Sequence, residues 1–329
     1  MKGALSFTLV FLLLLFRTAT VVLPGEQHQS TVPPADTSHV ATAPEGQHGN
    51  ENVGEIIVHH IKNSNTLELP PPIGEVHLPH FELFGVDLSI TKHVVMMLAA
   101  AVLLVVVLSL AARRQRPDEV PTGFAAAIET VVEFIRNQIA IPNMGEKLGL
   151  AFTSYLCTVF FFILTCNLLG LIPYGATATS NVNVTAALAV LTFILTQAMA
   201  IKANGIGGYL RHLTGGVHPA MWIVMIPVEF LGLFTKPFAL CIRLYANMTA
   251  GHIVLLSLIS LIFIMGKNGA NPIVGLSIAP ISVAFSLFVN VLELFVALLQ
   301  AYIFTLLSSL FIGLAAHSEH HEETHEAHH

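Results

Sequence analysis

The stretch PFALCIRLYANMTAGHIVLLSLISLIFIM, residues 237–265, decides the fold, because it is a long apolar run. It contains one arginine, Arg243. A run of this length and composition predicts a membrane-spanning segment. A charge near the bilayer centre costs at least about 2.5–3.5 kcal/mol on insertion scales. A chain tolerates this cost where the charge has a partner or a function, so Arg243 is the first candidate functional residue.

The composition is typical of a membrane protein with several spans. Only 10% of the 329 residues are charged, and the mean hydropathy is +0.74. The sequence contains no basic stripe with interleaved aromatic residues, which argues against nucleic-acid binding. The three cysteines, Cys157, Cys166 and Cys241, lie in apolar stretches without disulfide or metal-ligand spacing, so we interpret them as small buried hydrophobes.

The N-terminal part is predicted to lie outside the membrane. Residues 1–23 are typical of a signal peptide, because Lys2 precedes an apolar core too short to span a bilayer; an uncleaved anchor is the alternative. Residues 24–92 are predicted to be an extracytoplasmic, partly disordered region. Within it, residues 67–91 alternate apolar and polar side chains, as in a short surface hairpin.

Residues 93–316 are predicted to form the membrane domain. The first span, 94–112, is followed at once by Arg113 and Arg114, which places that end in the cytoplasm and the preceding region outside. Residues 118–141 repeat apolar side chains at helical spacing and predict a helix lying in the interface. The second and third spans are residues 148–172 and 184–201.

Two later segments, residues 219–265 and 272–316, are too long for ordinary spans. One helix over the first segment would be roughly 70 Å long, against a hydrocarbon core of about 30 Å. The segments are either four conventional spans or two strongly tilted, bent helices. No short polar turn splits the first segment at Arg243, which favours two long helices. The predicted fold is therefore all-α, with about five membrane helices, the last two long and tilted, plus one interfacial helix.

Polar residues recur along both long segments. Glu229, Lys236 and Arg243 are spaced by seven, which places them on one side of a helix, about 10 Å apart. Asn247 lies one turn beyond Arg243, whereas His252 lies on nearly the opposite face. The last segment carries a second polar sector, formed by Asn290, Glu293 and Gln300.

The chemistry of these residues indicates a proton path with a barrier, although packing contacts are the alternative for the amides, Glu229 and Lys236. A buried arginine stays protonated, so it acts as a fixed positive charge and favours the ionised form of a nearby carboxyl. Histidine and partly buried glutamate titrate near neutral pH, so His252 and Glu293 are candidate proton carriers.

Residues 317–329 hold six histidines and four glutamates and are predicted to form a flexible cytoplasmic tail. We interpret these histidines, and those before residue 93, as compositional bias, and we expect no metal site and no cofactor.

The strings LFTKPFALCIRLYANMTAGH (233–252) and FVNVLELFVALLQAYIFTLL (288–307) resemble subunit a of the rotary Fo-type ATP synthase. TCNLLGLIP and NVNVTAALA resemble other segments of that family, and the resemblance covers about residues 75–316. It implies a multi-pass protein of the bacterial inner membrane with its N-terminus outside and its C-terminus in the cytoplasm. The implied partners are a ring of c subunits, the b subunits of the peripheral stalk, the rest of the complex and the lipid bilayer.

The resemblance also implies a role for each polar residue. Arg243 would face the membrane carboxyls of the c ring and block direct proton leakage between two half-channels. The outer half-channel would be lined by Asn247, His252, Glu293 and Gln300, and Glu229 would lie near the cytoplasmic exit. Some relatives have Glu at the position of His252 and His at that of Glu293, and this exchange keeps one acid and one imidazole. Lys236 matches a family position to which we assign no role.

The resemblance predicts a non-catalytic subunit that couples proton flow to ring rotation and ATP synthesis. The sequence contains no P-loop, so ATP would be made in another part of the complex. A secondary ion transporter is the main alternative, but it predicts an internal repeat that we do not find. A metal exporter would need ligands within the spans, where only His252 lies. An intramembrane hydrolase would need a nucleophile with a base, or a pair of metal-binding residues, and the spans contain neither pattern.

Overall fold

The computed structural model describes the membrane domain and four short strands that precede it. The predicted signal peptide, most of the region 24–92 and the tail after residue 317 lie outside the described residues, so those domain boundaries stay predictions. The described residues are 66–68, 75–77, 82–83, 86–87, 91–114, 122–172, 177–213, 221–266 and 272–317.

The membrane domain is helical throughout its described part, which confirms the predicted fold class. Five helices are long and apolar enough to cross a membrane, with α4 and α5 counted as one continuous helix. A π-helix, η1 (Ile135–Ala140), joins α4 to α5, and a 3-10 turn, η2 (Ala178–Ser180), precedes α6. The α-helices are α3 (Lys92–Arg114), α4 (Phe124–Phe134), α5 (Ile141–Gly170), α6 (Val182–Leu213), α7 (Trp222–Met265) and α8 (Pro272–His317).

The alternating region before α3 forms two antiparallel hairpins where the pattern suggested one. β1 (Thr66–Glu68) pairs with β2 (Glu75–His77), and β3 (Glu82–Leu83) pairs with β4 (Val86–Asp87).

The predicted interfacial helix and second span are parts of one bent helix. Within the predicted helix 118–141, residues 124–140 form α4 and η1. The predicted span 148–172 follows a break at Gly145, where φ is 76° and ψ is 167°. Glycine adopts this conformation without a Cβ clash. After the break the helix turns back on itself, since a Cβ on Gly149 would lie 2.9 Å from the Cα of Ile141.

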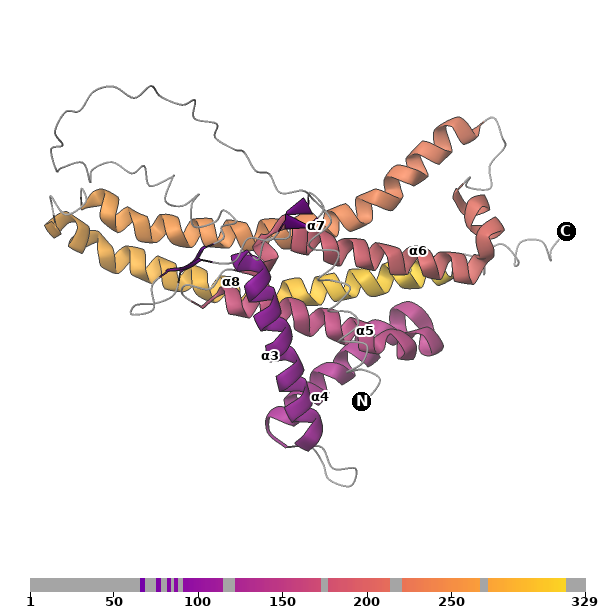
Figure 1. Ribbon diagram of the computed structural model, residues 1–329, viewed down its shortest axis with the longest axis horizontal. Helices are drawn as coiled ribbons and strands as arrows, with labels where there is room; N and C mark the ends of the chain where they lie inside the picture. The colour runs from indigo at the N-terminus through magenta and orange to yellow at the C-terminus, as the bar shows by residue number, and fades with distance from the viewer. Residues whose placement is uncertain are drawn as a thin grey trace.

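The last two helices have the predicted lengths, 44 residues for α7 and 46 for α8, so the alternative of four conventional spans is wrong. Figure 1 shows α7 and α8 side by side, with α7 bending and turning away from α8 toward its N-terminal end. Pro227 and Pro237 lie inside α7. An interior proline removes a backbone hydrogen bond and bends a helix, which accounts for a bent α7.

The core lies among α3, α5, α6, the middle of α7 and the C-terminal half of α8. Its largest fully buried side chains include Tyr155 and Phe162 of α5, Leu188 of α6, Leu244 of α7 and Phe304 of α8. We call this region the helical core.

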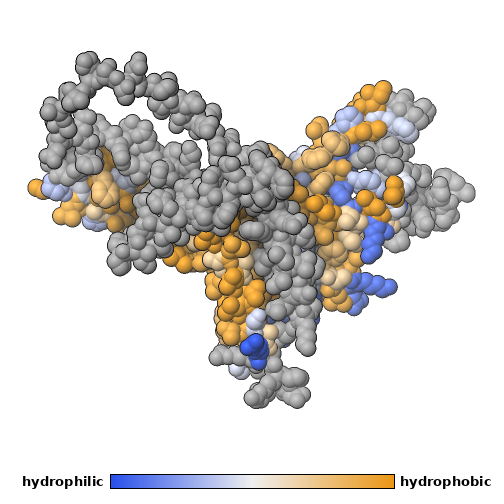
Figure 2. Space-filling view, viewed as in Figure 1, coloured by the Kyte–Doolittle hydropathy of each residue, from blue (hydrophilic) through white to orange (hydrophobic). Residues whose placement is uncertain are grey.

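Residues 249–266 of α7 and 272–296 of α8 extend beyond the core and form what we call the arm. Within these two ranges only Gly266, Gly275, Ser282 and Glu293 are buried, and the other residues are half-buried or exposed. Figure 2 shows apolar residues along this arm where grey atoms do not cover it. The arm therefore presents apolar side chains that this chain itself does not cover.

Candidate functional site

Arg243 lies on α7 at the level of the helical core, and its side chain is exposed. Its helix neighbours Leu240 and Leu244 are buried. Within the part of the chain that the structure describes, the Arg243 guanidinium forms no hydrogen bond and no ion pair. An exposed, unpaired cation in a helix of this apolarity is a costly arrangement unless another molecule supplies the counter-charge.

Asn247 and Gln300 join α7 to α8 one helical turn beyond Arg243. The Asn247 side-chain amide donates to Oε1 of Gln300 at 3.0 Å, and Gln300 is 2% exposed. Two of the predicted polar residues, 53 positions apart, are therefore in direct contact. Asn290, which the spacing placed in the same sector as Gln300, is exposed instead.

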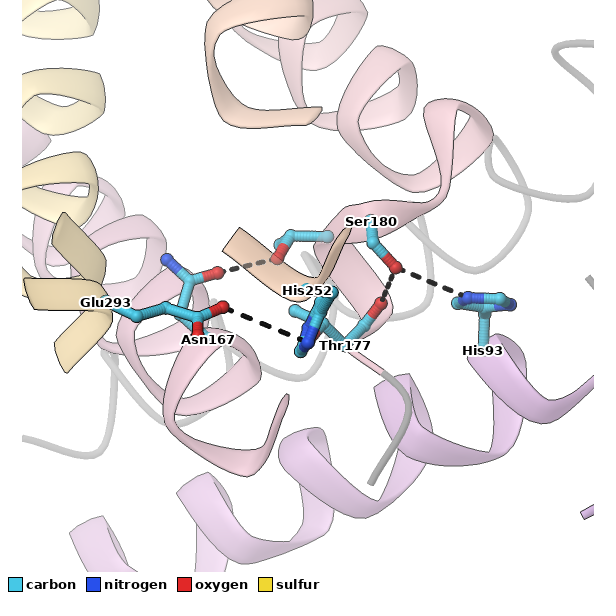
Figure 3. A network of polar contacts seen from close by, with 7 residues as sticks. His93, Asn167, Thr177, Ser180, His252 and Glu293 are labelled. Carbon is cyan, nitrogen blue, oxygen red and sulfur yellow. Dashed lines mark hydrogen bonds and ion pairs between the residues drawn. The ribbon is translucent and has the colours of Figure 1, made fainter. Parts of the chain in front are cut away.

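Glu293 and His252 form the second contact between the two long helices. Nδ1 of His252 lies 3.9 Å from Oε1 of Glu293, and the Glu293 side chain is 4% exposed. Neither carboxyl oxygen of Glu293 has a hydrogen-bond partner among the described residues. Figure 3 shows the two side chains pointing toward one another from α8 and α7. Because a buried, unbonded carboxylate is costly, this pair is suited to hold a proton and release it.

Gly251 allows this approach. A Cβ at position 251 would lie 2.7 Å from Oε1 of Glu293 and 2.9 Å from its Cδ. The carboxyl group of Glu293 therefore lies against the backbone of α7, in the space that the side chain of any larger residue at position 251 would fill.

On its other side His252 meets the segment that joins α5 to α6. Oγ1 of Thr177 is hydrogen-bonded to Nε2 of His252. Next to it, Oγ1 of Thr179 donates to Oδ1 of Asn167 at 2.6 Å, and the Asn167 amide donates to the Ala297 carbonyl at 3.4 Å. Nothing in the sequence assigned a role to these three polar residues, because threonines in a turn and an asparagine in an apolar helix have no distinctive spacing.

The profile of the family described as "ATP synthase A chain" matches residues 94–313. An ATP synthase subunit a from Pelodictyon phaeoclathratiforme is 52% identical over 313 residues, which cover 91% of this chain and 88% of that protein. The "ATP synthase subunit a 2" of Chlorobaculum tepidum is 53% identical over 298 residues, covering 89% of this chain and 82% of the relative.

The chain belongs to the ATP synthase A chain family.

It is therefore a membrane-embedded Fo subunit that acts with the rest of an ATP synthase complex. A more distant relative, subunit a of Anaeromyxobacter dehalogenans, is 45% identical over 342 residues, or 93% of this chain and 87% of the relative. The resemblance based on the sequence motifs is confirmed along most of the chain.

In this subunit a, Glu229 stands apart from the other predicted site residues. It lies half-buried near the N-terminal end of α7, two helical turns before Lys236. The Lys236 ammonium lies over the ring of Phe311, 5.7 Å from its centroid. The structure thus brings together Asn247 with Gln300 and His252 with Glu293, whereas Arg243 and Glu229 contact neither pair within the described part of the chain.

A resident metal finds no ligand set in the described part of this subunit a. No group of three or more His, Cys, Asp or Glu side chains there is placed to hold an ion. The three cysteines are free thiols, with Cys166 and Cys241 buried and Cys157 half-buried.

Proposed function

We propose that this chain is the non-catalytic, proton-conducting subunit a of a bacterial ATP synthase, coupling proton flow to rotation of a c ring. The observation that carries the proposal is the exposed Arg243 of α7, which is unpaired among the described residues. The same helix carries His252, whose imidazole lies beside the buried carboxyl group of Glu293 on α8. The fixed cation and the titratable pair lie on two helices whose apolar surfaces are largely uncovered.

Arg243 supplies the barrier in this mechanism. Its guanidinium stays protonated, attracts each c-ring carboxylate as an anion, and repels a proton moving directly from one half-channel to the other. Its exposure supports this role, since a guanidinium bonded within the chain would not be available to a partner.

Asn247, His252, Glu293 and Gln300 line the outer half-channel. A proton passes the Glu293–His252 pair and neutralises a c-ring carboxylate. The neutral carboxyl group can then rotate into lipid, whereas an ionised carboxylate there would cost several kcal/mol. After nearly a full turn the proton leaves near Glu229 toward the cytoplasm. Each charge that crosses yields about 2.3 kcal/mol per 100 mV.

The partners follow from the uncovered surface. The c ring covers the face of α7 and α8 that carries Arg243, and lipid and the b subunits of the peripheral stalk cover other apolar surfaces. The positive-inside rule applied to Arg113 and Arg114 places the start of α3 outside and its end in the cytoplasm of a bacterial inner membrane. Residues 1–23 are then a signal peptide, 24–92 extracytoplasmic, and 317–329 a cytoplasmic tail.

The experiment is ATP-driven proton pumping in membrane vesicles that carry the complex with Arg243→Ala, beside the unmutated complex. Pumping is expected to fall by about a hundredfold or more, the scale on which fixed electrostatic groups act. Lys236→Ala is the matched control, because it removes another exposed cation from the same helix and should retain most of the pumping. Unimpaired pumping in assembled Arg243→Ala complexes would show that Arg243 is not the barrier and would overturn the mechanism.

A further inference from the structure

A line of polar groups continues beyond His252, away from Glu293. Thr177 is hydrogen-bonded to His252. Three residues along the chain, Oγ of Ser180 donates to the Thr177 carbonyl at 2.8 Å. The same hydroxyl lies 3.5 Å from Nε2 of His93. Figure 3 shows Glu293, His252, Thr177, Ser180 and His93 in this order across the field of view.

These groups come from four separate elements and meet where the chain is densely packed. His93 belongs to α3 and is 3% exposed, and Thr177, just before η2, is 2% exposed. Burying polar groups is costly unless they are bonded, so a cluster kept only for packing would be expected to bond all its members. This line instead ends at Glu293, whose two carboxyl oxygens have no hydrogen bond among the described residues.

Two glycines leave space for two polar groups of this line. A Cβ on Gly170, at the end of α5, would overlap the Thr177 hydroxyl. A Cβ on Gly251 would come within 2.7 Å of the Glu293 carboxyl. Because glycine has no side chain, Gly170 leaves room for the Thr177 hydroxyl and Gly251 leaves room for the Glu293 carboxyl. Both groups that adjoin the His252 imidazole therefore lie in a space left by a glycine.

We propose that Thr177, Ser180 and His93 form the outer part of the proton path that leads to His252 and Glu293. The proposal rests on the proposed function and on its orientation, in which α3 begins outside, so that His93 stands at the outer end of the line. Hydroxyl and imidazole groups both donate and accept, which a relay requires. The Ser180 hydroxyl donates to a carbonyl, so transfer at this step includes a rotation of that hydroxyl or a bridging water.

The test measures passive proton conduction through the complex in vesicles stripped of the soluble head, driven by a potassium diffusion potential. Thr177→Val removes the hydroxyl with little change in volume and should lower conduction about tenfold, equivalent to about 1.4 kcal/mol in the barrier. His93→Leu should have a similar effect. Thr177→Ser restores a hydroxyl and should restore conduction, which a purely structural role of the threonine methyl would not predict.

Thr192→Val is the matched control. It makes the same change at a buried threonine that is bonded to Tyr155 at 2.9 Å, in the core between α5 and α6 and away from the line. Conduction per assembled complex should equal that of the unmutated protein. Assembly is checked by the amount of this chain that purifies with the c subunits.

The outcomes separate this proposal from the proposed function. If Glu293→Gln stops conduction while Thr177→Val and His93→Leu conduct normally, the outer path is overturned and the function stands. If Glu293→Gln also conducts normally, the proposed function itself fails.

A second measurement keeps the proposal testable should those variants not assemble. Ser180→Cys should react with a small water-soluble thiol reagent added from outside, and the reaction should block conduction. Labelling no faster than that of the native cysteines in the unmutated complex would overturn the path.

Discussion

The helical core and the arm differ in how many of their buried polar groups form hydrogen bonds. In the core most buried hydroxyls are bonded, as Thr192 is to Tyr155 and to the Leu188 carbonyl, although Ser308 has no hydrogen-bond partner among the described residues. In and beside the arm, the buried oxygens of Thr249, Ser282, Ser286 and Glu293 have no hydrogen-bond partner among the described residues.

This difference separates the part that holds the fold from the part that we propose conducts protons. Bonded hydroxyls and close packing fix the core in one arrangement. Buried polar groups without hydrogen bonds lower the stability of the fold. A protein retains such groups where they transfer protons or bind a partner. Four experiments test this separation, in order from the largest expected effect to the smallest.

The first substitution is Phe162→Ala in the core. Phe162 is fully buried, and removing a buried aromatic ring costs about 3–5 kcal/mol through lost contacts and the cavity left behind. The complex should therefore dissociate or denature earlier in detergent, whereas proton conduction per assembled complex should stay close to normal. A large loss of conduction at full assembly would show that the core takes part in transport and would remove the distinction.

The second substitution is Glu293→Gln in the arm. Pumping should fall by about a hundredfold, the lower end of what a positioned acid or base contributes. Stability should be unchanged or slightly higher, because a neutral amide replaces a buried carboxyl without hydrogen bonds among the described residues. ATP-driven pumping and thermal denaturation of the purified complex measure the two effects, and a stability loss larger than that of Phe162→Ala would contradict the comparison.

The third substitution is Gly251→Ala, with Gly232→Ala as its control on the same helix. The new methyl at position 251 meets the Glu293 carboxyl, whereas a Cβ at position 232 meets nothing within 4 Å among the described residues. Overpacking costs about 1–3 kcal/mol. Displacement of the carboxyl should therefore lower conduction about tenfold, which corresponds to about 1.4 kcal/mol. Equal conduction by the two variants would show that the contact between Gly251 and Glu293 has no functional consequence.

The fourth experiment compares substitutions at two buried hydroxyls, those of Thr192 and Ser286. Thr192→Val loses the bond to Tyr155 and should lower stability by about 1 kcal/mol. Ser286→Ala removes a hydroxyl without a partner among the described residues and should change stability by less than about 0.5 kcal/mol. Thermal denaturation of the purified complex in detergent measures both, and a greater loss for Ser286→Ala would reverse the assignment of bonded core and unbonded arm.

Much of the fold can be predicted from the sequence, because the length of each apolar run and the positions of the charged residues can be read directly along the chain. They predicted five membrane helices, two of them long, and a seven-residue polar repeat on α7. The break at Gly145 and a second break at Gly205 in α6, where φ is 68°, were not predicted. A glycine in a helical pattern looks the same in the sequence whether or not its φ is positive.

The site was predictable only where it depended on residue type. A charge in an apolar helix identified Arg243, and titratable side chains identified His252 and Glu293. The contact of Gly251 with Glu293 and the bond of Thr177 to His252 depend on tertiary packing of residues 42 and 75 positions apart. Nothing in the spacing of glycines or turn threonines indicates such a contact.

The hydrogen bond between Asn247 and Gln300 also fixes the register of the two long helices. The facing surfaces of α7 and α8 are rich in aliphatic side chains, which by themselves specify the axial position of one helix against the other only weakly. A slip of one turn would move α8 by about 5.4 Å along α7. That slip would carry Glu293 out of reach of His252, now 3.9 Å away, and away from the space beside Gly251. One amide pair therefore aligns a proton-carrying pair that lies about one and a half turns away on α7 and about two turns away on α8.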